Sequence, residues 1–350
     1  MILNGFGFLE KMQPACGEGL IPARVTAAFK ERYEVVCEYG TAFAAIKRGA
    51  YQKTGAEEAF PAVGDYVSLR YEETGDSLIV KTLPRTSKFS RSNFSGHAAG
   101  YVKTVLEQTV AANFDYVFLM SSLNHDFNVA RMERYLAMAY HSGAQPVIIL
   151  TKADVAVDAG NKLEKARTIA GQTPIHVISA HTREGLCELA AYFAPGKTAV
   201  FLGSSGVGKS SLVNALAGDT VMPVNDIRED DSKGRHTTTR QQMIFLPGGA
   251  MVIDTPGLRE LGMWEAEEGL SETFADVEAY LGRCRFSDCS HHSEPGCAIR
   301  EAVEQGMLSK ERMERYLRLV KETQFSKSKS KPSKDASGKR PRSKTWVAED

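Results

Sequence analysis

The chain has 350 residues, of which 43% are hydrophobic and 25% charged, and its 43 Lys and Arg balance 43 Asp and Glu. These values are typical of a soluble globular protein with two or three domains. Six cysteines are too few for a disulfide scaffold, and no apolar run approaches the roughly 20 residues that a membrane helix needs. The N-terminus lacks a secretory leader, so we expect a cytoplasmic monomer with no membrane partner.

Short strands are predicted in the N-terminal region. The stretch GDYVSLRYEETGDSLIVKTLP (64–84) alternates apolar and polar residues around the turn residues TGDS. Strands of this kind close into a small β-barrel or sandwich, and we assign residues 1–85 to such a domain. Residues 86–110 are polar and mixed, which predicts a loop or linker.

Strands and helices are predicted to alternate over residues 111–265. Apolar runs end in polar loops at DYVFLMSS, PVIILTKAD, PIHVISA, TAVFLGSSG and AMVIDTPG, and helical stretches such as VARMERYLAMAYHSG, NKLEKARTIAG and TREGLCELAAYFA separate the earlier runs. This alternation predicts a parallel sheet with helices on both faces. Because ligands of such sheets bind at the carboxyl ends of the strands, the last four runs bring four polar motifs to one crevice.

GSSGVGKS at 203–210 matches the phosphate-binding pattern G-x-x-x-x-G-K-[ST] and lies between an apolar strand and the helical stretch SLVNALAG. Its glycines let the backbone wrap a phosphate chain, and the helix N-terminus adds N–H donors. Lys209 is expected to reach the β- and γ-phosphates. The predicted phosphate-binding residues are Gly203, Ser204, Ser205, Gly206, Val207, Gly208, Lys209, Ser210 and Ser211.

DTPG at 254–257 follows the strand AMVI further along the chain. Phosphoryl transfer needs a carboxylate at the metal in addition to the phosphate-binding loop. We therefore expect Asp254 and Ser210 to hold magnesium, and the N–H of Gly257 to bind the γ-phosphate.

TKAD at 151–154 and the pair Ser179 and Ala180 follow two other predicted strands. The carboxylate of Asp154 can accept both the N1–H and the amino group of guanine. Adenine lacks this pair of donors, and a site built this way rejects the wrong base by roughly 10⁴. The predicted base-binding residues are Thr151, Lys152, Ala153, Asp154, Ser179 and Ala180. If TKAD is instead an ordinary strand-end loop, the chain is an ATPase.

The motifs stand in an unusual order. TKAD comes first, followed by Ser179 and Ala180, GSSGVGKS, GRHTTT and DTPG, which is the GTPase order rotated. A site built where strand ends meet in space survives such a rotation when the old termini lie close together. The sequence therefore predicts a circularly permuted GTPase domain.

Cys284, Cys289, His291 and Cys297 are spaced C-x4-C-x-H-x5-C. Three thiolates and an imidazole make the closed tetrahedral shell of a structural zinc site. We expect a structural Zn²⁺ that folds this region rather than a catalytic one. His292 is adjacent and could replace His291 as the ligand.

With these motifs the chain resembles the RsgA (YjeQ) family of circularly permuted GTPases. The resemblance covers roughly 20–325 and is carried by the permuted order, GRHTTT at 234–239 and CRFSDCSHHSEPGC at 284–297. It implies an N-terminal OB-fold, a central permuted P-loop GTPase and a C-terminal, mainly helical zinc domain with His291 as the favoured ligand. It also implies GTP hydrolysis that the small ribosomal subunit stimulates, with a role in late maturation of that subunit.

The resemblance gives His236 in GRHTTT the task of orienting the attacking water. Leu258 follows DTPG where many GTPases have a Gln, and a leucine cannot orient water. Thr238 is our choice for the threonine that binds magnesium. Thr151 stands where many GTPases have an Asn, and its hydroxyl makes fewer hydrogen bonds. We expect a weaker tie between the base-reading and phosphate loops, while Asp154 keeps the guanine preference.

The expected partners are GTP, GDP and the small ribosomal subunit with its rRNA. Residues 326–344 carry eight Lys or Arg and one Asp, a net charge of +7, so the rest of the neutral chain carries −7. A negative body favours docking through chosen patches over non-specific coating of nucleic acid. Arg85, Lys88 and Arg91 are candidates for such contacts. The tail is expected to be disordered, either as an RNA contact or as a solvated extension.

The sequence thus predicts five regions: a barrel over 1–85, a linker over 86–110, a GTPase domain over 111–265, a zinc-binding domain over 266–325 and a basic tail over 326–350. The predicted function is subunit-stimulated GTP hydrolysis that acts as an assembly checkpoint. The alternative is a GTP-gated rRNA-binding module in which hydrolysis is incidental.

Overall fold

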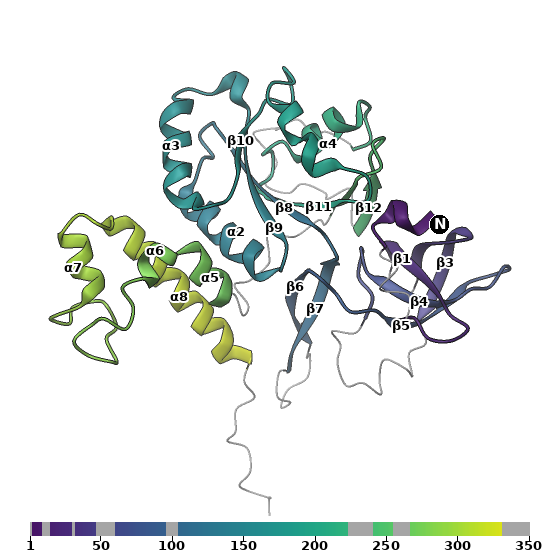
Figure 1. The fold of residues 1–350 in the computed structure, drawn as a ribbon, viewed down its shortest axis with the longest axis horizontal. Coiled ribbons are helices and arrows are strands. Elements are labelled where there is room, and N and C mark those ends of the chain that lie inside the picture. Colours follow the sequence, from purple (N-terminus) through teal and green to yellow (C-terminus); the bar gives the residue numbers. More distant parts are fainter. Residues whose placement is uncertain are drawn as a thin grey trace, which may run out of the picture.

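The computed structural model describes residues 2–8, 15–29, 32–46, 60–95, 104–222, 241–254 and 267–330. A β-barrel, a helix-covered sheet and a helical C-terminal part follow one another along the chain (Figure 1). None of the helices in these ranges combines the length and the apolar character needed to cross a lipid bilayer.

Five strands form the N-terminal barrel: β1 (Ile21–Ala28), β2 (Tyr33–Cys37), β3 (Gly40–Ile46), β4 (Tyr66–Arg70) and β5 (Ser77–Thr82). They pair in the order β1-β2-β3-β5-β4, and β4 pairs again with β1, which closes the barrel. Val25, Val67 and Ile79 are fully buried inside it. The short 3-10 helix η1 (Ile2–Phe6) adds the buried Leu3 to a second small cluster. The predicted small barrel is confirmed.

Two strands, β6 (Lys88–Ser95) and β7 (Thr104–Ala112), form an antiparallel ribbon that lies below the central sheet and beside the barrel in Figure 1. The sequence predicts a loop or linker over 86–110, and the structure differs. At the base of the ribbon Phe89 stacks on Phe114 with 4.9 Å between ring centroids, and Val110 is buried. Serines interrupt the apolar residues of β6, so the alternation typical of a strand is missing and pairing with β7 supplies the order.

The central sheet contains β8 (Tyr116–Ser122), β9 (Gln145–Thr151), β10 (Ile175–Val177), β11 (Thr198–Gly203), β12 (Gln241–Phe245) and β13 (Met251–Asp254). Its order is β10-β9-β8-β11-β13-β12, in which only the last pair is antiparallel. This confirms the predicted parallel sheet. β12 also pairs with β1 of the barrel at Ala27 and Ala28, so the two parts share one 11-stranded sheet.

Helices cover both faces of the central sheet. One face carries α2 (Val129–His141) and α3 (Ala159–Ala170), and the other carries α4 (Lys209–Ala217) and the 3-10 helix η5 (Leu186–Phe193). Along β8, Val117 and Leu119 pack with α2 and α3, whereas Phe118 and Met120 pack on the opposite face. This alternation is the period of two that a strand imposes. The stretch TREGLCELAAYFA, predicted as helical, forms η5 rather than an α-helix.

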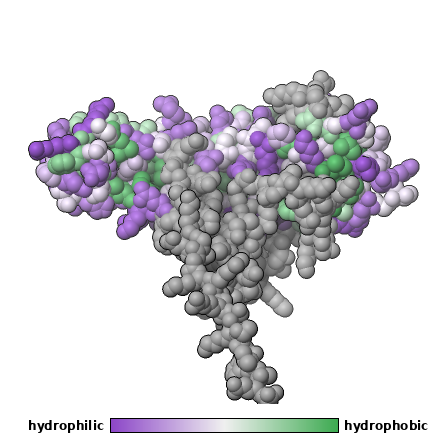
Figure 2. Space-filling model, turned by 90° about the horizontal axis from the view of Figure 1, so that it is seen from below, coloured by the Kyte–Doolittle hydropathy of each residue, from purple (hydrophilic) through white to green (hydrophobic). Residues whose placement is uncertain are grey.

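The C-terminal part contains α5 (Glu267–Thr273), α6 (Ala275–Glu278), α7 (Ala298–Glu304) and α8 (Lys310–Ser330). It packs on α2, where the fully buried Glu133 accepts hydrogen bonds from Arg312 at 2.6 Å and Arg315 at 2.5 Å. The coloured surface in Figure 2 is mainly hydrophilic over this part and over the barrel, with smaller hydrophobic patches. The interface with α2 thus fixes the C-terminal part through buried charges.

Candidate functional site

Four predicted motifs meet at one edge of the central sheet. β9, β10, β11 and β13 run parallel, with β8 between β9 and β11. TKAD begins at the last residue of β9, Ser179 follows β10, GSSGVGKS begins at the last residue of β11, and Asp254 ends β13. Because parallel strands end on the same side of a sheet, these motifs share its carboxyl edge.

The phosphate-loop motif forms a tight turn between β11 and α4. Gly206 and Gly208 have φ angles of 68° and 104°, a region that residues with a side chain rarely adopt. A Cβ added at Gly203 would lie 2.9 Å from the Val207 side chain and 3.0 Å from the carbonyl oxygen of Met120. The glycines therefore allow both the turn and its close approach to the sheet.

Lys209 lies beside Asp254 under this turn. Its Nζ donates to the carbonyl oxygens of Gly203 at 2.9 Å and Ser204 at 2.8 Å. Lys209 and Asp254 line a cavity of about 20 Å³, large enough for about one water molecule. Burial raises the pKa of Asp254, and the charge of Lys209 opposes that rise. A cation held next to a partly buried carboxylate suits the binding of phosphate and of a divalent metal.

Two hydrogen bonds join the predicted base-binding residues to neighbouring loops. The hydroxyl of Thr151 donates to the carbonyl oxygen of Val207 in the phosphate loop at 2.6 Å, so a threonine here does tie the two loops together. The buried Ser179 donates to a carboxylate oxygen of Asp154 at 2.7 Å. Asp154 itself is exposed. The structure thus holds an accessible carboxylate beside the phosphate loop.

The other predicted nucleotide-site residues fall into two groups. Within the described residues, Ser205 lies at the exposed tip of the phosphate loop, Ser210 and Ser211 lie in the first turn of α4, and Lys152, Ala153 and Ala180 are partly buried. His236, Thr238, Gly257 and Leu258 lie outside the described residues.

The three basic residues suggested as RNA contacts differ in their surroundings. Arg85 donates to both carboxylate oxygens of Asp65, at 2.8 and 2.7 Å, and its side chain is only 12% exposed. Arg91 is exposed and donates to Gln108 on β7. Lys88 lines a cavity of about 660 Å³ between the barrel and the end of α2. Arg85 therefore serves the internal structure of the barrel, which removes it from the candidates.

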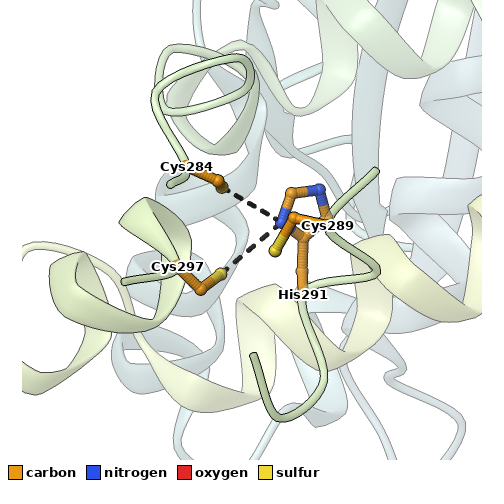
Figure 3. Close-up of side chains that lie close together, drawn as sticks. All are labelled: Cys284, Cys289, His291 and Cys297. Atoms are coloured by element: carbon orange, nitrogen blue, oxygen red, sulfur yellow. Dashed lines mark hydrogen bonds between the residues drawn. The ribbon is translucent and has the colours of Figure 1, made fainter. Parts of the chain in front are cut away.

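The four predicted zinc ligands form one cluster in the C-terminal part (Figure 3). Their ligand atoms lie within 4.8 Å of one another, and Nδ1 of His291 is 3.5 Å from the sulfurs of Cys284 and Cys297. With Zn–S of about 2.3 Å and Zn–N of about 2.0 Å, a tetrahedral ion separates sulfur from nitrogen by about 3.5 Å. The donor set and its spacing therefore fit this metal.

Burial and crowding shift the pKa values of two of these four side chains. Burial and the neighbouring Cys297 and Cys284 raise the pKa of Cys289 to about 11. Burial, with the nearby His292, lowers the pKa of His291, so its imidazole is neutral and able to ligate. His292 points its Nδ1 to the carbonyl oxygen of Ser290 at 2.8 Å. The structure thus places His291, not His292, in the cluster.

Glu294 holds the loop that carries these ligands, and sequence reasoning missed it. Its carboxylate accepts hydrogen bonds from the main-chain N–H groups of Ser290, His292 and Ser293 at 2.9 to 3.0 Å. A further bond comes from the Ser290 hydroxyl at 2.5 Å. These hydrogen bonds hold the pKa of Glu294 far below its usual value, and the bond from the Ser290 hydroxyl contributes most. An acidic residue inside a Cys/His loop is the sequence signal that would have found it.

The chain is similar to known proteins over most of its length. The model of the RsgA GTPase family matches residues 82–264. A Listeria monocytogenes protein named "Small ribosomal subunit biogenesis GTPase RsgA 2" is 44% identical over 310 residues, which cover 89% of this chain and 86% of that protein. A Methanosarcina acetivorans protein named "Small ribosomal subunit biogenesis GTPase RsgA" is 44% identical over 303 residues, covering 85% and 79%.

Two solved structures share the fold. YjeQ from Thermotoga maritima is 28% identical with a TM-score of 0.63, and the match covers 87% of this chain and 99% of that one. YloQ, a circularly permuted GTPase, is 24% identical with a TM-score of 0.57, over 88% and 96% of the two chains. The motif order, the fold and these similarities agree: the chain is a circularly permuted GTPase of the RsgA family.

Proposed function

We propose that this GTPase is stimulated by the small ribosomal subunit and acts as a checkpoint in late maturation of that subunit. The observation that carries the nucleotide chemistry is the single sheet edge that gathers TKAD, Ser179, the phosphate loop and Asp254. The names of relatives that are 44% identical over most of the chain support the ribosomal role.

Guanine recognition is assigned to Asp154. The hydrogen bond from Ser179 leaves the second carboxylate oxygen of Asp154 and the remaining lone pairs of the first for the N1–H and amino group of the base. Ala180 offers its backbone N–H to the base oxygen, and the stem of Lys152 lies along the ring. Together these groups favour guanine over adenine, because adenine leaves the carboxylate unpaired.

Phosphate binding is assigned to the loop over 203–211. Its N–H groups and Lys209 surround the phosphate chain, and the N–H of Gly257 meets the γ-phosphate. Ser210 and Thr238, with Asp254 through water, are the residues that would hold Mg²⁺. When bound, this ion neutralises charge on the β- and γ-phosphates.

Hydrolysis requires a water aimed at the γ-phosphorus, and His236 is assigned this task. The water oxygen forms a bond to phosphorus while the bond from the γ-phosphorus to the bridging oxygen breaks, which releases phosphate and leaves GDP. Leu258, next to DTPG, offers no hydrogen-bonding group for this purpose. The imidazole of His236 can hold the water by accepting one of its protons in a hydrogen bond.

The metal in the C-terminal cluster is proposed to be a structural Zn²⁺. Cys284, Cys289, His291 and Cys297 would fill all four tetrahedral positions and leave none for a substrate. None of the six cysteines, all of which lie in the described ranges, forms a disulfide. Reduced thiols fit the cytoplasm, where we place the protein as a monomer.

The barrel and the basic tail are proposed to contact rRNA. A small barrel of this kind commonly binds RNA, and the tail over 326–344 carries a net charge of +7 on a chain that is otherwise negative. Contact through these parts agrees with docking on one large RNA particle rather than coating of any nucleic acid.

The His236→Ala variant tests whether hydrolysis is the purpose of the protein. We expect its phosphate release in the presence of small subunits to fall by about 10² or more, with GTP binding retained and subunit maturation impaired. Full maturation without turnover would contradict the proposal and favour a GTP-gated rRNA-binding module.

A further inference from the structure

The loop between β8 and α2 is fixed by its own side chains. The amide oxygen of Asn124 accepts from the hydroxyl of Ser122 at 2.7 Å and from the main-chain N–H of Asp126 at 3.0 Å. Asn128 caps α2 by accepting from the N–H of Arg131 at 3.0 Å. This loop follows the strand that lies next to β11 in the sheet, so it lies beside the phosphate loop.

Asp126 is the residue of this loop that reaches the phosphate loop. Its carboxylate accepts a hydrogen bond from the hydroxyl of Ser204, and Arg131 donates to both of its oxygens at 3.0 and 2.9 Å. Burial opposes ionisation of Asp126, but the hydrogen bonds from Ser204 and Arg131 and the charge of Arg131 lower its pKa below the usual value. The group that faces Ser204 at neutral pH is therefore a carboxylate.

Ser204 links this carboxylate to the phosphate-binding lysine. Its carbonyl oxygen, together with that of Gly203, accepts hydrogen bonds from Nζ of Lys209. A contact that fixes Ser204 also fixes one of the two main-chain acceptors that place the ammonium. Arg131 balances the negative charge, which would otherwise lie unpaired close to bound phosphates.

We propose that Asp126 is a positioning residue for the phosphate loop, acting through Ser204 on Lys209. The role rests on the proposed nucleotide binding at this loop. It lies outside all of the motifs by which the nucleotide site is identified from the sequence, because Asp126 follows a different strand. Asp126 touches no nucleotide in this account; it holds the main chain in the form that receives the β-phosphate.

The test is a double-mutant cycle of Asp126→Ala and Ser204→Ala in the full chain, with affinities for GDP, GTP and GMP measured by competition against a fluorescent GDP. Loss of one charge-assisted hydrogen bond predicts about tenfold weaker binding of GDP and GTP in each single variant. The double variant should be no weaker than the singles, because both substitutions remove the same contact. GMP has no β-phosphate, so its affinity should change least.

Two further variants separate positioning from general damage. Ser204→Thr keeps a hydroxyl that can donate to Asp126, so it should lose less GDP affinity than Ser204→Ala does. Asp76→Ala removes a carboxylate in the barrel that pairs with Arg32 and is 37% exposed, close to the 32% of Asp126. It should leave nucleotide affinity unchanged. Asp126→Asn keeps an amide oxygen that can accept from Ser204, so the logarithm of its loss of GDP affinity should be roughly half of that predicted for Asp126→Ala. This variant provides the measurement if Asp126→Ala does not fold.

Independent effects that multiply in the double variant would overturn the proposal. Equal losses for GMP and GDP would do the same, because they would indicate a loosened fold rather than a displaced Lys209. A wild-type chain that binds neither GDP nor GTP would instead contradict the proposed function, so the two failures are distinguishable.

Discussion

At the residue scale, single hydrogen bonds hold the side of the site that we propose to bind the base. Thr151 reaches Val207 in the phosphate loop, and Ser179 reaches Asp154 from the next strand. A carboxylate already held in place loses less conformational freedom when guanine binds, which leaves more of the interaction free energy for affinity. Asp154 is therefore the residue on which base preference should depend most.

Asp154→Asn should lower GTP affinity by about 10² or more, because an amide cannot accept both guanine donors. Weak binding of ATP should stay the same, so the preference for GTP narrows or disappears. Competition of GTP and ATP against a fluorescent GDP measures both affinities. Asp158→Asn is the matched control, an exposed carboxylate four residues along that accepts from Asn161. An unchanged preference in Asp154→Asn would indicate an ATPase.

The ligand cluster predicts a metal-dependent fold for the loop over 284–297. Cys297→Ser should reduce bound zinc from one ion per chain to nearly none at equal protein concentration, because the site loses one of four ligands. Elemental analysis of the purified chain measures this. Cys187→Ser, which changes an exposed cysteine outside the cluster, should keep the zinc. Retention of a full complement of zinc by Cys297→Ser would contradict the assigned ligand set.

At the scale of elements, α2 joins the nucleotide-binding sheet to the C-terminal part. Its N-terminal end carries Arg131, which pairs with Asp126, and two residues later Glu133 receives Arg312 and Arg315 from α8. Glu133 is fully buried, and both of the arginines that pair with it come from α8. The position of the C-terminal part is therefore tied to a helix that begins beside the phosphate loop.

Glu133→Gln should destabilise the docking of α8 by about 3–5 kcal/mol, because it leaves two arginines without the buried charge between them. Hydrogen exchange of residues 309–324 should become faster, while the barrel keeps its protection. Glu164→Gln is the control, since its pair with Arg167 is more than half exposed and is worth at most about 1 kcal/mol. Equal exchange in the two variants would show that this ion cluster does not hold α8.

The sequence was most informative where a local pattern decides the structure. The parallel strands and the glycines of the phosphate loop follow from apolar runs and from turn chemistry, and the structure has them where they were expected. The ribbon of β6 and β7 was missed because serines interrupt the apolar residues of β6, so its order comes from pairing with the next strand rather than from its own pattern. The Asp126–Ser204 and Glu133–Arg312 contacts were missed because their partners lie 78 and 179 residues apart, and no local pattern indicates a partner at such a distance.

At the scale of the whole molecule, the barrel and the nucleotide-binding sheet are continuous. β1 pairs with β12, and the fully buried Arg24 on β1 donates to the carbonyl oxygen of Asn113 at 2.9 Å and to the hydroxyl of Thr198 at 3.0 Å. Along the sequence, β12 follows the segment that contains GRHTTT. A partner that binds the barrel therefore contacts the part of the molecule that pairs with β12. β12 in turn comes shortly after the proposed catalytic His236 in the sequence.

The most direct test of the account is phosphate release from GTP and from ATP, with and without purified small ribosomal subunits, at two salt concentrations. We expect turnover that is specific for GTP and rises sharply with subunits. This rise should shrink at the higher salt concentration, because contacts with RNA phosphates weaken as salt increases. GTP turnover that is the same with and without subunits would contradict the ribosomal role and leave only the GTPase.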